Sequence, residues 1–195
     1  MIRSFTPVVL AAAAGLLCGC VAEPLPKPVV GYTCCNLSPV YGAWISSNNV
    51  QGGTRLPAGQ KAHFESIKRT YYVYGQIGGQ DYGLRNDSGH DEKSTLEFLL
   101  RTIVPEDPNV ALATWPADVQ AAVHAAKVQV GMTRPQVAMA LGYPSPEDTP
   151  KLDDPVWRYW VIVGDQRIEL HFDAEGKLAA VTGKPEAVAE VFKAS

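Results

Sequence analysis

The stretch GMTRPQVAMALGYP, residues 131–144, contains signals for both the start and the end of one short helix. Thr133 and Gln136 have the spacing of a capping box, in which each side chain satisfies a backbone N–H group of the other residue. Gly142 can adopt the left-handed conformation that ends a helix, and Pro144 cannot continue one. We therefore expect a helix that begins after Thr133 and ends before Gly142.

Three strands are expected to follow this helix. The first two flank Gly164-Asp165, a dipeptide typical of two-residue hairpin turns, which would pair Val161 with Ile168. Apolar and polar residues alternate in the second strand, so one face of the sheet should be buried. The expected strands cover residues 156–163, 166–173 and 177–182, and further helices are expected over 94–103, 116–127 and 185–193.

The same pairing predicts an apolar patch on the other face of this sheet. It would consist of Arg158, Trp160, Ile162 and Val181, among otherwise polar side chains. An apolar patch rimmed by charges usually marks a contact. The contact could be with the C-terminal helix, with the front half of the chain or with another protein.

Four short segments of the C-terminal half match the pattern of a known family. They are Val130–Val137, Leu141–Pro144, Trp157–Tyr159 and Asp173–Lys177. Together they resemble the BamE-like (SmpA/OmlA) lipoprotein domain over about residues 110–183. The resemblance implies a two-layer ααβββ domain in a non-catalytic outer-membrane lipoprotein that faces the periplasm. It also implies a candidate partner, the machinery that assembles β-barrel proteins.

The front half of the chain departs from that family. Residues 32–90 are rich in Gly and Tyr and contain short runs in which apolar and polar residues alternate. These runs predict a small β-rich segment, which could form a barrel. The expected strands are 61–67, 71–77 and 81–85, with Trp44-Ile45 as a further candidate. Residues 91–109 would form a connecting helix and loop, and 184–195 the C-terminal helix. The predicted fold class is thus α+β, a BamE-like C-terminal domain preceded by this segment.

The N-terminus reads as an export signal. Residues 1–19 contain Arg3 and an apolar run, and Leu17-Cys18-Gly19-Cys20 resembles a lipobox, although Cys18 stands where Ala, Ser or Thr is usual. We therefore expect cleavage before Cys20, lipid attachment at Cys20 and anchoring in an envelope membrane, with Val21 favouring the outer membrane. The Pro-rich residues 20–31 would form an extended tether.

Two cysteines remain after this assignment, the neighbours Cys34 and Cys35. They could form a vicinal disulfide, form an intermolecular bridge, or stay reduced through burial. The four histidines show no ligand-type spacing with the cysteines or with each other, so neither a metal nor another cofactor is expected.

Composition excludes several classes of function. The chain has 195 residues, of which 46% are hydrophobic, and a net charge of −3 without clustered Lys and Arg, which argues against nucleic-acid binding. No nucleophile elbow, zinc helix motif or phosphate loop is found, so an enzyme is not expected. The leading hypothesis is a periplasm-facing module that binds an envelope protein, in outer-membrane protein assembly or envelope integrity. The alternative is a module that binds cell wall or a small ligand through the β-rich half.

Overall fold

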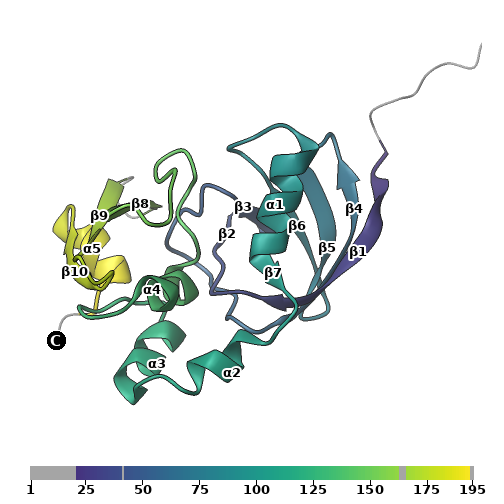
Figure 1. Cartoon of the computed structure of the whole chain (residues 1–195). Coiled ribbons are helices and arrows are strands. Elements are labelled where there is room, and N and C mark those ends of the chain that lie inside the picture. The colour runs from purple at the N-terminus through teal and green to yellow at the C-terminus, as the bar shows by residue number, and fades with distance from the viewer. Residues whose placement is uncertain (1–20, 41, 163–165, 194–195) are drawn as a thin grey trace, which may run out of the picture.

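A computed structural model describes residues 21–40, 42–162 and 166–193. The described chain forms a seven-stranded sheet and a three-stranded sheet, with five short helices around them (Figure 1). The predicted leader, the lipidation residue Cys20 and the turn Gly164-Asp165 lie outside the described residues. None of the helices in the described ranges is long and apolar enough to cross a membrane.

The larger sheet is built mainly from the front half of the chain, and its strand order is β2-β3-β6-β5-β4-β1-β7. Helix α1 (Glu92–Thr102) lies against one face, and the sheet curls around it (Figure 1). Phe64, Val73 and Leu84 point from the sheet toward Leu99 of this helix, and all four are fully buried. The strands are β1 (Glu23–Thr33), β2 (Pro39–Val40), β3 (Trp44–Ser46), β4 (Lys61–Lys68), β5 (Tyr72–Ile77), β6 (Gln80–Arg85) and β7 (Ile103–Val104).

Strand β1 occupies most of the segment that the sequence predicts to be a tether. It pairs with β4 from Glu23 to Tyr32, and Leu25 is buried in the core. Proline has no backbone N–H to donate, so it is tolerated at the edge of a sheet. Strand β7 pairs only with Tyr32 and Thr33, which leaves the rest of that side of β1, including its prolines, as such an edge. The Pro-rich segment is therefore part of the folded domain.

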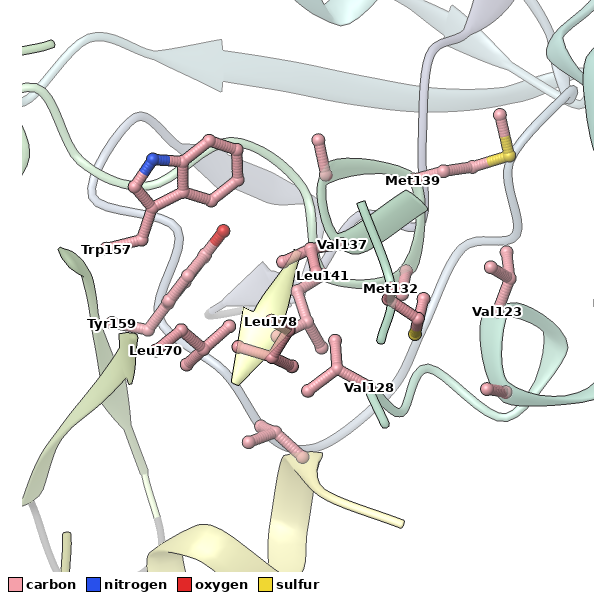
Figure 2. Packing of buried hydrophobic residues seen from close by; sticks show 14 of the residues in the cluster. Val123, Val128, Met132, Val137, Met139, Leu141, Trp157, Tyr159, Leu170 and Leu178 are labelled. Carbon is pink, nitrogen blue, oxygen red and sulfur yellow. The ribbon is translucent and has the colours of Figure 1, made fainter. Parts of the chain in front are cut away.

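The second hydrophobic core lies between the three-stranded sheet and the remaining helices. Trp157, Tyr159 and Leu170 from the sheet pack near Val137 and Leu141 of one helix (Figure 2). The elements are α2 (Pro108–Leu112), α3 (Ala117–His124), α4 (Arg134–Leu141), β8 (Val156–Val161), β9 (Gln166–Phe172), β10 (Leu178–Thr182) and α5 (Pro185–Val191).

The pairing of β8 with β9 differs from the predicted register. Val161 lies opposite Gln166, and Tyr159 lies opposite Ile168, so the predicted pairing of Val161 with Ile168 is wrong. The connection is two residues longer on the β8 side than a two-residue turn. Because side chains alternate with a period of two, the shift of two leaves the same residues facing the core.

Local sequence signals predict both ends of α4 correctly, but not the start of α1. Thr133 and Gln136 form the predicted capping box, with the Thr133 N–H donating to Gln136 Oε1 at 2.8 Å, and α4 ends at Gly142. Helix α1 begins earlier than predicted, because Asp91 is its N-cap and accepts a bond from the Ser94 backbone at 2.9 Å. Ser94 therefore lies inside the first turn.

The two sheets are joined by a buried polar junction. Asn36, just after β1, donates from Nδ2 to Ala140 O at 3.0 Å and to Val123 O at 2.6 Å. Residues 47–58, which we call the crossing segment, run from the large sheet to the small one. Within it Gln51 is fully buried. Its backbone N–H donates to Trp160 O at 2.7 Å, and its backbone carbonyl accepts from the Ile162 N–H at 2.8 Å.

The predicted fold class is wrong. The described chain is β-rich, with a curled seven-stranded sheet as its largest element, and it contains no self-contained BamE-like ααβββ domain. The small sheet obtains part of its core from outside the predicted range 110–183, namely Ala58 of the crossing segment and both Ala187 and Val191 of α5. The junction contacts are long-range, and no local pattern in the sequence announces them.

Candidate functional site

A groove of about 550 Å³ lies on the large sheet. Val73 and Leu84 point toward α1, and the strand alternation places Tyr74 and Gly83 on the opposite, outer face. The groove is lined by Ala43, Trp44, His63, Glu65, Ser66, Tyr74, Gly75, Gln76, Asp81, Tyr82 and Gly83. Its volume falls in the range of about 300–1,000 Å³ that is usual for small-molecule sites.

Gly83 allows an indole ring to lie against the floor of the groove. Strand β3 pairs with β6 in parallel, with Trp44 opposite Gly83, and Tyr74 is paired with Gly83 from the other side. A Cβ atom at Gly83 would lie 2.3 Å from Cζ3 of the Trp44 ring. Any larger residue at position 83 would therefore displace the indole.

Trp44 belongs to a continuous row of aromatic rings. Its ring centroid is 5.6 Å from that of Tyr74 and 5.1 Å from that of Tyr72, and Tyr72 lies 4.3 Å from Tyr71. We call these four residues the aromatic row. All four are half-buried, so each ring keeps part of its surface open to solvent.

Polar side chains stand beside the aromatic row. Gln76 and Asp81 are opposite each other in the sheet, and Gln76 Nε2 donates to Asp81 Oδ1 at 2.9 Å. His63 is the partner of Gln76 in β4, and its Nε2 lies 4.0 Å from the Glu65 carboxylate. The lining contains two carboxylates and no lysine or arginine. The groove thus combines stacking surfaces with hydrogen-bonding groups and an acidic bias.

The predicted patch on the small sheet is only partly as expected. Trp160 is on the outer face, where it is half-buried. Its Nε1 donates to Asp148 Oδ2 at 3.1 Å, and the Arg167 guanidinium lies 5.0 Å from its ring centroid. Arg167 is also paired with Asp148 at 2.7 Å. A polar network of the loop between α4 and β8 therefore holds this indole.

The other patch residues are dispersed. Arg158 pairs with Glu169 at 2.9 Å, and Ile162 is exposed. A register shift after Leu178 places Val181 opposite Leu170, so it packs against the core instead of joining Trp160.

The two neighbouring cysteines form a disulfide with each other. Cys35 is buried, and the Cys34 N–H donates to Thr102 O at 2.9 Å beside the end of α1. Within the described ranges, no group of three or more His, Cys, Asp or Glu residues is arranged to hold a metal ion.

The sequence predicted the strands over 61–67, 71–77 and 81–85, but not the groove on their outer face. Gly78 and Gly79, both with positive φ angles, form the turn between the last two of these strands. The available signal was the alternation of Tyr72 and Tyr74 on one face of a strand, since large aromatic side chains on an outer face need a reason.

Comparison of the chain with protein-family models, with characterised proteins and with solved structures finds no match.

Proposed function

We propose that the protein is a non-catalytic binding module, tethered to an envelope membrane by lipid at Cys20, and that the groove on the large sheet is its ligand site. The observation that carries this proposal is the aromatic row beside hydrogen-bonding side chains on the face of the large sheet opposite α1. Convergent polar groups in an aromatic-lined depression are the usual features of a ligand site.

The exposure of the groove carboxylates supports a non-catalytic role. Glu65 and Asp81 are both exposed at the surface. A carboxyl that acts as a general acid needs burial or a close like charge to hold its proton near neutral pH. Neither carboxyl is buried, so the pair suits hydrogen bonding to a bound molecule.

The position of β1 leaves only a short link between the proposed lipid at Cys20 and the large sheet. Only two residues separate Cys20 from Glu23, the first residue of β1. An extended chain spans at most about 3.5 Å per residue, so a lipid at Cys20 would hold the large sheet within roughly 10 Å of the membrane surface. A module held this way would bind material close to that membrane, on the periplasmic side if the outer membrane is the anchor.

The test uses an unlipidated form, the Cys20→Ser chain exported behind an ordinary cleavable leader. Without lipid it should leave the membrane fraction, and when purified it should still co-sediment with isolated envelope. Trp44→Ala in this background should abolish co-sedimentation, whereas Trp160→Ala should not. Unchanged co-sedimentation of the Trp44→Ala chain would overturn the assignment of the groove.

A second candidate function is binding of an envelope protein through the outer face of the small sheet. The observation that favours it is the exposed side chain of Ile162, 54% accessible, beside the half-exposed Trp160. If Ile162→Ser removes a stoichiometric protein partner from detergent-solubilised envelope while Trp44→Ala does not, this function is favoured over the groove.

A further inference from the structure

We propose that the ligand of the groove is a linear oligosaccharide of uncharged pyranose rings. This inference rests on the proposed function, because it names the ligand class of the same site. It is argued from the charge of the lining, the shape of the aromatic row and the hydrogen-bonding groups beside it.

The charge of the groove lining disfavours anionic ligands, and the nearest cations of the aromatic row, Lys68 and Arg85, flank Tyr72 outside the groove. Glu65 and Asp81 are the formally charged side chains of the groove, and no lysine or arginine lines it. A nucleic acid could stack on the rings, but its phosphates need cationic partners. Free phosphates and acidic peptides are disfavoured for the same reason, so the ligand is neutral or cationic.

The aromatic row favours a ligand with repeated flat apolar faces. Trp44 and Tyr74 line the groove with their ring centroids 5.6 Å apart, Tyr72 continues the row 5.1 Å from Trp44, and Trp44 rests against Gly83. The C–H face of a pyranose ring is apolar, and its burial on an indole or phenol ring is favourable. A row of such rings suits a chain of sugars better than a single one.

A small cation fits this groove less well. A cation held by aromatic rings gains little at an exposed site and more only when it is desolvated. A groove of about 550 Å³ with half-exposed rings does not enclose a single ammonium group. The site therefore lacks the enclosure on which cation selectivity depends.

The polar groups match the edges of a sugar ring. Asp81 accepts from Gln76 through Oδ1, which leaves Oδ2 to accept from a ligand hydroxyl. The hydroxyls of Ser66 and Tyr74 bond to no other group within the described part of the chain, and sugar hydroxyls both donate and accept.

The test is calorimetric titration of the unlipidated chain with β-linked tetramers of N-acetylglucosamine and of glucose, and with tetralysine as the cationic probe. At least one sugar tetramer should bind. Trp44→Ala and Asp81→Ala should each weaken binding about tenfold or more, and Trp160→Ala should leave it unchanged. Thermal unfolding shows whether each variant is folded. If Trp44→Ala is not folded, Asp81→Ala still tests the site, because it changes an exposed side chain.

The outcomes separate the ligand class from the function. If tetralysine binds and the sugars do not, or if no probe binds while Trp44→Ala still abolishes envelope co-sedimentation, the saccharide class is overturned and the groove remains the site. If Trp44→Ala leaves both sugar binding and co-sedimentation intact, the proposed function fails with it.

Discussion

Gly142 has a backbone conformation that other residues rarely adopt. Its φ is +79°, and an added Cβ would lie 2.8 Å from Nδ2 of Asn49. That amide donates to Leu141 O at 2.9 Å, so it is already committed to the junction between the sheets. A side chain at position 142 would therefore strain the end of α4 and displace a junction contact together.

Gly142→Val should lower the free energy of unfolding by about 3 kcal/mol, through backbone strain and the clash. Thr133→Ala at the other end of α4 should cost about 1 kcal/mol, the usual cost of a lost cap. Urea denaturation of both variants gives the comparison. The description of α4 is contradicted if the Gly142 variant is no less stable than the Thr133 variant.

Asp91 predicts a pH dependence at the start of α1. Hydrogen bonds from the Ser94 side chain, and next from its backbone N–H, lower the pKa of Asp91 below its ordinary value of 3.8. A lowered folded-state pKa contributes stability above the unfolded value and loses it as the pH falls through the folded one. The stability difference between wild type and Asp91→Asn should thus be present at pH 7 and shrink below about pH 4, and a constant difference would contradict it.

At the scale of elements, local patterns predicted what local chemistry determines. Strands β4, β5 and β6 and helix α4 were found because alternation, turn residues and caps lie within a few positions of each other. Strand β1 was missed because Pro24, Pro26 and Pro28 indicate a linker in isolation. Its place in the sheet depends on β4, about forty residues later, which no local pattern reveals.

Leu25→Asp tests whether β1 belongs to the fold. Leu25 is 6% exposed, and a buried unpaired carboxylate should lower the free energy of unfolding by about 3 kcal/mol or more. The matched control is Val30→Asp on the same strand, where the side chain is 67% exposed and the cost should stay below about 1 kcal/mol. Equal thermal stability of both variants and wild type would restore the tether interpretation.

At the scale of the whole molecule, the junction makes the two sheets one unit. The Asn36 side chain donates to carbonyls of α3 and α4 and accepts from the Ala58 N–H at 3.0 Å, all in the buried interior. Sequence reasoning treated the front segment and the C-terminal domain as separate, because a single asparagine among apolar residues has no distinctive pattern. The predicted fold class failed for this reason.

Asn36→Ala should therefore lower the free energy of unfolding by about 3 kcal/mol, because the buried Ala58 N–H loses its partner and the bonds to α3 and α4 are lost. Calorimetry of the wild-type chain should show one cooperative transition. Two well-separated transitions in the wild type, or a neutral effect of Asn36→Ala, would show that the halves fold independently.

Beyond the alternation of Tyr72 and Tyr74, the groove could not be predicted from the sequence, because its residues come from separate parts of the chain. Trp44 precedes the crossing segment, Glu65 is in β4, and Asp81 is in β6. The parallel pairing of β3 with β6 brings Trp44 onto Gly83, and parallel pairing of short strands has no local sequence signal. The predicted leader, in contrast, rests on a local pattern, and lipid attachment at Cys20 stays a prediction that does not depend on the fold.

Oligosaccharide binding on the outer face of the large sheet can be followed by amide and indole NMR shifts during titration. With the N-acetylglucosamine or glucose tetramer, we expect saturable shifts of the Trp44 indole N–H and of the Tyr74 and Gly83 amides, with the Trp160 indole unmoved. An unmoved Trp44 indole at saturating sugar, or shifts gathered at Trp160, would contradict it.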